Sequence, residues 1–247
     1  MSSQVDGAFT PFTIPFRITI EDLPLEVLIH ILSFISLQDL LQNINRVSKR
    51  FYFTINTTPK LWSEVHFDNP VQITKASLET LCKYSKTISS LLLPCSIYDI
   101  DVPEVDWYLS SCSFASLQWL NLSEASLSTL CFLYSAPKLT IIDLSGCSLL
   151  LDEDFYVLKS CASLEQIYVS FTNVSQSTLT AICKDKSLVV LDACDVAVDG
   201  IHCKRILDNT QGHLVHMTVS FQGSKLEFDS EIGNVYQNTT MRVYKYV

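Results

Sequence analysis

The sequence predicts an α/β solenoid, with parallel strands inside and helices outside, preceded by a small three-helix module. Three observations lead to this fold class. An apolar triplet typical of a strand recurs seven times, stretches with helical spacing separate the copies, and residues 20–66 have helical patterning without the triplet. We therefore expect a flexible N-terminus at 1–19, the helical module at 20–66 and a solenoid of about six to seven repeats at 67–247.

The helical module is predicted from start signals in the sequence. We expect its helices to begin at Leu23-Pro24, at Leu37 and at about Arg46. Pro24 suits a first helical turn, where the missing backbone N–H has no cost. Ser36 and Asp39, three residues apart, form the pattern of a capping box for the second helix.

The first of these helices is too apolar to lie free on a surface. Its apolar residues cover nearly every face: Leu25, Val27, Leu28, Ile29, Ile31, Leu32, Phe34 and Ile35. Such a helix is buried on more than one side, yet a module of about 45 residues rarely completes a core alone. Part of this surface is therefore covered by another protein or by the solenoid, and the residues leave the choice open.

The repeats carry apolar residues at offsets 0, +3 and +5, of which the last two share one face of a strand. The copies are Trp62/Val65/Phe67, Ile88/Leu91/Leu93, Leu117/Leu120/Leu122, Leu139/Ile142/Leu144, Leu164/Ile167/Val169, Leu188/Leu191/Ala193 and Leu214/Met217/Val219. They start at intervals of 26, 29, 22, 25, 24 and 26 residues. One triplet alone means little in so apolar a chain, but seven at regular spacing predict a stacked solenoid.

Helices are expected between the strands. The stretches with helical spacing contain Leu78, Leu81 and Cys82; Leu127, Leu130 and Leu133; Phe155, Leu158 and Cys161; Leu179, Ile182 and Cys183; and Ile201, Ile206 and Leu207. Acidic residues at the expected helix starts support this prediction, because a negative charge at a helix N-terminus interacts favourably with the helix dipole. The closing segment, 241–247, alternates like a strand and is expected to cover the edge of the last repeat.

The residues between the strand anchors face the concave side of such a solenoid, which makes them candidates for binding a protein target. Those selected are Trp119, Asn121, Asp143, Glu165, Tyr168, Asp192 and His216. Trp119 and Tyr168 are the expected anchors, because large aromatic residues dominate interface energies. The alternative is ordinary surface scatter or packing against the helical module.

Residues 21–41, Val47-Ser-Lys-Arg-Phe and Pro59-Lys-Leu-Trp together resemble an F-box. Ser48 and Phe51 stand where that family often has Cys and Trp. The repeats resemble the cysteine-containing class of leucine-rich repeats, since Cys161 precedes Leu164 and Cys147 follows Leu144. The chain thus resembles the F-box/leucine-rich-repeat family.

The resemblance implies binding to the Skp adaptor and, through it, to cullin and RING subunits. The implied adaptor contacts are Leu23, Pro24, Val27, Ile31, Leu40 and Phe51. For each of these residues the alternative is a place in the module's own core. The implied function is that of the substrate-recognition adaptor of an SCF-type ubiquitin ligase, which binds an unknown target protein. The alternative is an interaction scaffold that recruits no cullin.

Composition excludes several other classes. The net charge of −9 comes without a cluster of Lys and Arg, so nucleic acid is not expected as a partner. No apolar stretch in the N-terminal part is long enough to cross a membrane. The nine cysteines include no Cys-x-x-Cys pair, and their odd number without an export signal predicts reduced thiols in the cytoplasm or nucleus.

No catalytic, cofactor-binding or metal-binding residues are expected. The sequence contains no P-loop, Gly-x-Ser-x-Gly, Gly-x-Gly-x-x-Gly or His-Glu-x-x-His motif. Cys194, Asp192 and His202 could form a nucleophile with its base, but nothing in their spacing brings them together. An enzyme without a recognisable motif is the remaining alternative, and we expect a protein that is not an enzyme.

Overall fold

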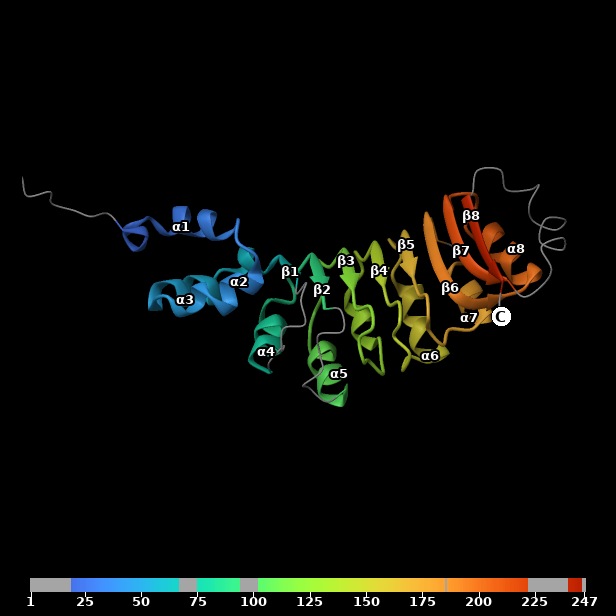
Figure 1. Cartoon of the computed structure of the whole chain (residues 1–247), viewed down its shortest axis with the longest axis horizontal. Helices are drawn as coiled ribbons and strands as arrows, with labels where there is room; N and C mark the ends of the chain where they lie inside the picture. Colours follow the sequence, from blue (N-terminus) through green and yellow to red (C-terminus); the bar gives the residue numbers. More distant parts are fainter. Residues whose placement is uncertain (1–18, 67–74, 94–101, 185, 222–239, 246–247) are drawn as a thin grey trace, which may run out of the picture.

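The structure is a computed structural model, and it describes residues 19–66, 75–93, 102–184, 186–221 and 240–245. A helical module lies at one end, and a long parallel sheet extends from it with helices along one side (Figure 1). The expected N-terminal segment, apart from Thr19, lies outside the described residues.

The helical module contains three α-helices, as predicted. They are α1 (Leu25–Leu32), α2 (Leu37–Gln42) and α3 (Lys49–Thr57), joined by the 3-10 helices η1 (Ile20–Asp22), η2 (Ile44–Arg46) and η3 (Pro59–Trp62). Pro24 is the residue that precedes α1. Ser36 Oγ accepts a hydrogen bond from the backbone N–H of Asp39 at 3.1 Å, which caps α2.

In the described part of the chain, the sheet contains eight strands in chain order, each parallel to the next. They are β1 (Glu64–His66), β2 (Ser90–Leu92), β3 (Trp119–Asn121), β4 (Ile141–Asp143), β5 (Gln166–Tyr168), β6 (Val190–Val198), β7 (His216–Phe221) and β8 (Thr240–Lys245). The closing segment does form a strand, β8, at the edge of β7. This arrangement is compatible with an α/β solenoid.

The helices that connect the strands lie along one side of the sheet, and among the described residues the opposite side is formed by the strands alone (Figure 1). The connections contain α4 (Lys75–Tyr84), α5 (Val102–Ser110), η4 (Cys131–Ser135), α6 (Asp152–Phe155), η5 (Tyr156–Ser160), α7 (Gln176–Ile182) and α8 (Gly200–Asn209). The helix expected around residues 127–133 is instead a bend followed by η4. Only 22 residues separate these two triplets, which leaves little room for a full helix.

The apolar triplets form the core of the sheet. The middle residue of each triplet lies in a strand and is fully buried: Val65, Leu91, Leu120, Ile142, Ile167, Leu191 and Met217. The first and third residues are also buried, except that Phe67 lies outside the described residues. One continuous cluster of buried side chains runs from Leu28 of the module to Val219 of β7.

Four successive turns place a left-handed residue at the same point. Glu124, Gly146, Phe171 and Asp195 have φ angles of 59°, 76°, 57° and 70°, and each lies two residues after the last residue of its triplet. The N–H groups of the first three donate to the carbonyl oxygens of Ser145, Ser170 and Cys194 at 2.7, 2.8 and 3.0 Å. The same backbone conformation therefore recurs in these four turns, although the residue that adopts it differs from turn to turn.

An aromatic pair is one of the contacts that join the module to the sheet. Trp62 is 1% exposed and stacks on Tyr84 of α4, with ring centroids 5.3 Å apart. Its indole N–H donates to the Ile55 carbonyl at 2.9 Å, and the Tyr84 hydroxyl donates to the carbonyl of Asn56. These contacts fix the end of α3 against the first helix of the sheet.

Candidate functional site

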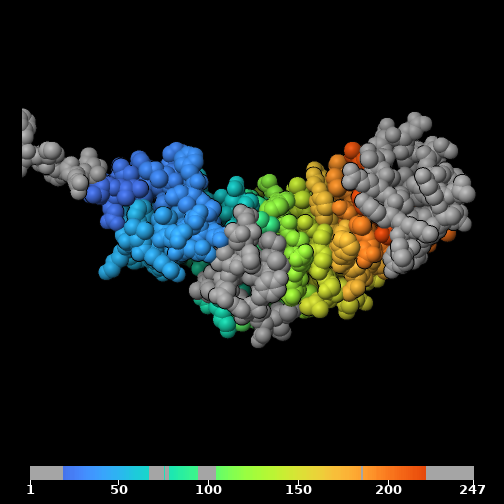
Figure 2. Space-filling view, viewed as in Figure 1, coloured from blue at the N-terminus to red at the C-terminus, as the bar shows by residue number. Residues whose placement is uncertain are grey.

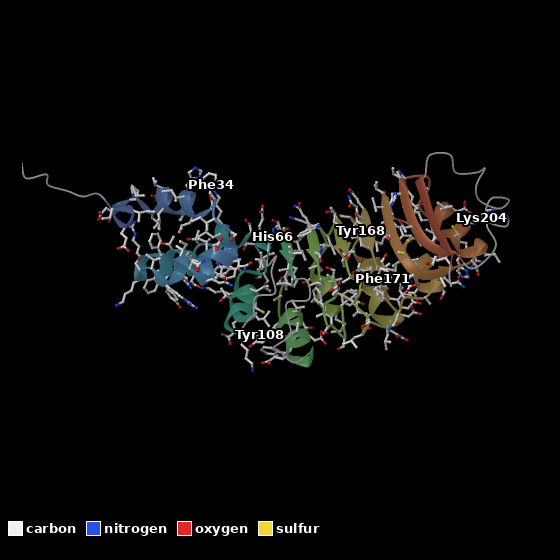
Figure 3. The ribbon with its side chains drawn as sticks, in the orientation of Figure 1. Phe34, His66, Tyr108, Tyr168, Phe171 and Lys204 are labelled. Carbon is white, nitrogen blue, oxygen red and sulfur yellow. The ribbon has the colours of Figure 1, made fainter. Side chains whose placement is uncertain are left out.

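The helical module presents an apolar stripe to solvent. Val27, Ile31 and Phe34 are spaced four and three residues apart, which places them along one side of α1 and its end. Val27 is 43% exposed and Phe34 is 77% exposed, and Ile31 is half-buried. Phe34 lies at the upper edge of the module in Figure 3, past the end of α1. An apolar stripe of this kind fits a groove on a partner protein.

The other predicted adaptor contacts divide into two groups. Pro24 is exposed and Leu23 is half-buried, and the Leu23 carbonyl accepts a hydrogen bond from the guanidinium of Arg50. Leu40 and Phe51, in contrast, are only 1% and 4% exposed within the module's own core. The internal alternative accounts for these two residues, because the helices of the module already cover them.

The face of the sheet opposite the helices is a second candidate surface. Strand alternation and register place two rows of side chains on this face. One row contains Trp119, Ile141, Gln166, Val190 and His216, and the other contains Asn121, Asp143, Tyr168, Asp192 and Thr218. Glu165 is exposed but lies one residue before β5, so that Gln166 occupies the predicted place on the face.

Hydrogen bonds order the second row. Asn121 donates to Asp143 Oδ2 at 3.2 Å, and Ser170 Oγ donates to Asp192 Oδ1 at 2.8 Å. Burial raises the pKa of the Tyr168 hydroxyl, and the charges of Asp143 and Asp192 add to this shift. Neither carboxylate forms an ion pair within the described part of the chain.

The face lies within a hollow of the molecular outline, between the helical module and β6 (Figure 2). His66 and Tyr168 lie along this strand side in Figure 3. The Trp119 ring meets the His66 ring edge to face, with centroids 5.4 Å apart. The face thus presents half-buried aromatic and acidic side chains in an ordered array.

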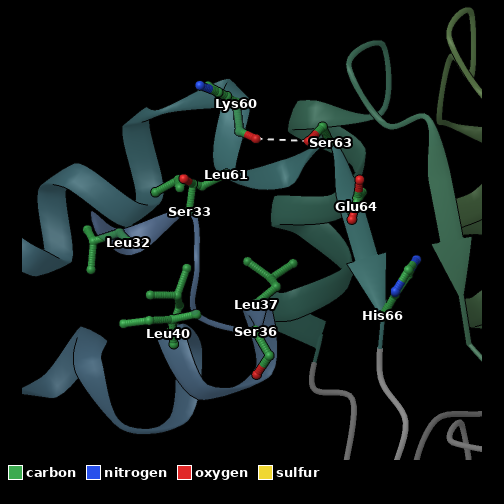
Figure 4. A pocket seen from close by; sticks show the side chains of 11 residues that line it. Leu32, Ser33, Ser36, Leu37, Leu40, Lys60, Leu61, Ser63, Glu64 and His66 are labelled. Atoms are coloured by element: carbon green, nitrogen blue, oxygen red, sulfur yellow. Dashed lines mark hydrogen bonds between the residues drawn. The ribbon is translucent and has the colours of Figure 1, made fainter. Parts of the chain in front are cut away.

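A cavity of about 260 Å³ lies where the module meets β1. Figure 4 shows its lining, which comes from the α1–α2 connection, α2, η3 and β1. Ser63 Oγ donates to the Lys60 carbonyl at 3.0 Å on one side, and Leu37 and Leu40 lie on the other. The residues that line the cavity do not pair a nucleophile with a base. We therefore treat the cavity as a packing gap between the module and β1 rather than as a catalytic site.

Two histidine contacts resemble parts of a catalytic site. His66 Nε2 lies 2.7 Å from Ser90 Oγ, but within the described residues no carboxylate bonds the other ring nitrogen, as a Ser–His–Asp arrangement requires. His202 Nδ1 lies 2.8 Å from Asp199 at the start of α8. His202 thus bonds Asp199 at the start of its own helix, whereas Asp192 and Cys194 lie on β6.

Two further kinds of site would involve a metal ion or a membrane. In the described ranges, no three His, Cys, Asp or Glu side chains are grouped to hold a metal ion. No single described helix is long and apolar enough to cross a membrane, and α1 with residues 37–46 qualifies only as a pair bent by 119°.

Comparison with known protein families matches residues 20–68 to the F-box-like domain. This segment contains the whole helical module, the first strand and the exposed stripe. F-box domains are typically non-catalytic modules that bind the Skp1 adaptor of SCF complexes. The match does not extend into the remainder of the sheet. No curated protein matches the chain.

Proposed function

We propose that this chain is the substrate-recognition adaptor of an SCF-type ubiquitin ligase. The F-box-like module binds the Skp adaptor, which connects it to cullin and RING subunits, and the sheet holds a target protein. The observation that carries this proposal is the apolar stripe within the matched segment, where Phe34 is 77% exposed. A side chain of this size is more often covered than left in water.

We propose that the sheet is a leucine-rich-repeat solenoid and that its face opposite the helices binds the target. The support is the parallel strand order together with six fully buried triplets and the two described residues of the first triplet, which are also buried. Trp119 and Tyr168 would anchor the target, while Asp143 and Asp192 would accept cationic groups from it. The contribution to ubiquitin transfer is proximity, because the target's lysines are held near a charged carrier enzyme.

The test is co-expression of the full chain with the Skp adaptor, followed by size-exclusion chromatography and an affinity measurement. We expect a stoichiometric complex whose affinity falls at least about tenfold in Phe34→Ala and about a hundredfold in Leu23→Ala/Pro24→Ala. The matched control is Phe171→Ala, because Phe171 is also an exposed phenylalanine, at 62%, but lies beyond the module.

Equal binding by the wild type and both module variants would contradict the assigned surface. A chain that stays soluble and monomeric beside the adaptor would refute the ligase role. Cullin added to the complex separates the remaining alternative, since an interaction scaffold would bind the adaptor without retaining cullin.

A further inference from the structure

Two free cysteine thiols meet between α4 and the end of α5. Cys82 lies in α4, Cys112 follows α5 by two residues, and their sulfur atoms are 3.0 Å apart. Both thiols also contact the carbonyl oxygen of Tyr108, at 3.1 Å from Cys82 Sγ and 3.3 Å from Cys112 Sγ. Tyr108 marks this place on the helix side of the sheet in Figure 3.

The two thiols differ in exposure and in acidity. Cys82 is partly exposed, while Cys112 is 7% exposed. The hydrogen bond from Cys112 lowers the pKa of the Cys82 thiol, and the same contact together with burial raises the pKa of Cys112. Cys82 therefore forms a thiolate more readily and is reached by solvent, while Cys112 stays protonated beside it.

We propose that Cys82 and Cys112 form an oxidation site, which takes a hydroperoxide as its oxidant and closes to an intramolecular disulfide. The arrangement joins an accessible attacking thiol to a neighbouring resolving thiol, as redox-sensitive pairs require. The site lies on the helix side of the sheet, apart from both candidate binding surfaces.

The reaction proceeds in two steps with hydrogen peroxide. The Cys82 thiolate sulfur bonds to one peroxide oxygen, the O–O bond breaks, and the leaving hydroxide takes up a proton to become water. The Cys112 sulfur then attacks the Cys82 sulfur, forming the S–S bond and breaking the S–O bond. Hydroxide leaves and becomes water with the proton from Cys112. The two sulfurs together lose two electrons, and the peroxide is reduced to two molecules of water.

Other cysteines of the chain provide internal controls. Burial raises the pKa of Cys147, Cys183 and Cys203 to about 12 each, so these thiols are both covered and protonated. Cys131 is exposed, but no second thiol contacts it in the described part of the chain. Among the described cysteines, a peroxide should therefore produce one crosslink, between Cys82 and Cys112.

The new bond would fasten α4, whose Tyr84 holds Trp62, to the end of α5. Closing the loop from residue 82 to residue 112 restricts the unfolded chain. We expect the oxidised protein to melt about 5 °C or more above the reduced protein.

The experiment treats the full chain with hydrogen peroxide, blocks the remaining thiols with N-ethylmaleimide and maps peptides without reduction. We expect a crosslinked peptide pair containing Cys82 and Cys112, two hydrogens lighter than the reduced pair and released by dithiothreitol. Cys82→Ser and Cys112→Ala should each lose this pair, while Cys131→Ser should retain it. Circular dichroism of each variant reports whether it is folded, and the wild-type map does not depend on the variants.

Three results would overturn the assignment: Cys82 carried on to sulfinic acid without a crosslink, Cys82 joined to a second chain, or Cys82 left unmodified while Cys131 reacts. An unchanged melting temperature in a fully crosslinked sample would refute the stabilising effect and leave the chemistry standing. Because none of these readouts involves the Skp adaptor, failure here is distinct from failure of the ligase role.

Discussion

The helical module and the sheet bury their apolar residues to different extents. Every described triplet residue of the sheet is buried, and its strands pair along the whole series. The module contributes Leu28 and Leu32 to the common core but leaves Val27 and Phe34 in solvent. Single apolar residues such as Trp107 are exposed beyond the module too, so the contrast lies in the triplet core of the sheet and the apolar stripe of the module. The stripe is the surface that fits the proposed partner.

The largest expected effect comes from removing the joint between these regions. Trp62→Ala should lower the free energy of unfolding by about 3–5 kcal/mol, because a buried indole is lost with its stacking partner and hydrogen bond. The measurement is urea unfolding followed by circular dichroism and by fluorescence of the remaining tryptophans.

Trp107→Ala is the matched control for this prediction. Trp107 is 63% exposed on α5, so its loss should change stability by no more than about 0.5 kcal/mol. Similar losses of stability in the two variants would mean that the Trp62 contacts contribute no more to folding than an exposed tryptophan does. The contrast between the buried joint and the exposed surface would then not hold.

A smaller effect should come from the turns of the sheet. Gly146→Ala should destabilise the chain by about 1–2 kcal/mol, because the left-handed backbone disfavours a side chain. A Cβ at this position would also lie 3.0 Å from Glu124 Cγ and 3.4 Å from its Cα. Adaptor binding should remain unchanged, since the module is not involved, and thermal melts with an affinity measurement check both expectations.

Gly212→Ala separates backbone strain from crowding. Gly212 has a φ of 77°, close to that of Gly146, but no neighbouring atom lies within 4 Å of the position that a Cβ would occupy there. We expect a loss of about 1 kcal/mol, smaller than that at Gly146. Equal losses would show that contact with Glu124 contributes nothing.

The smallest effect concerns helix caps. Asp199 caps α8 with a carboxylate oxygen that accepts from the N–H of His202 at 2.8 Å. Ser36 caps α2 with a hydroxyl group, which carries no charge. Burial opposes ionisation of Asp199, but hydrogen bonds from His202 outweigh it and lower its pKa. The folded pKa thus lies below the unfolded value of about 3.9, so the stabilisation is present above that pH and is lost as pH falls further.

At pH 7, Ser36→Ala should lower stability by about 1 kcal/mol, because the capping oxygen is lost. Asp199→Asn keeps a capping oxygen but removes the negative charge at the start of α8, so it should lower stability by about 0.3–1 kcal/mol. The Ser36→Ala deficit should persist at pH 3, while the Asp199→Asn deficit should shrink there as the wild-type carboxyl takes up its proton. Urea unfolding at the two pH values measures this, and a constant deficit at residue 199 would argue against the ionised cap.

The periodic apolar residues allowed much of the fold to be predicted. The triplets located the strands, since the middle residue of each triplet lies in one, because burial of every second side chain leaves a regular apolar spacing in the sequence. The three module helices were likewise found from Pro24, Ser36 and apolar spacing. What spacing could not give is which neighbour covers a residue, and so Leu40 and Phe51 were assigned to a partner while the module itself buries them.

Other features depend on contacts between repeats that no local pattern encodes. Lys186 is only 5% exposed, and its ammonium group donates to the Cys161 carbonyl at 2.7 Å, a place that its residue type argues against. Phe171 adopts a left-handed conformation that phenylalanine disfavours. The Cys82–Cys112 pair joins residues 30 positions apart. Each arises from stacking rather than from local preference.

The left-handed turns follow their triplets at a constant distance, which indicates where insertions in the chain can be accommodated. Strands β3 to β5 pair one residue to one residue, although their triplets begin 22 and 25 residues apart. In this described part of the chain the difference in length lies in the connections on the helix side, while the strand side keeps constant spacing. A peptide inserted in one of these connections should leave the candidate binding face intact, whereas one added residue at a strand would move its side chains to the opposite face.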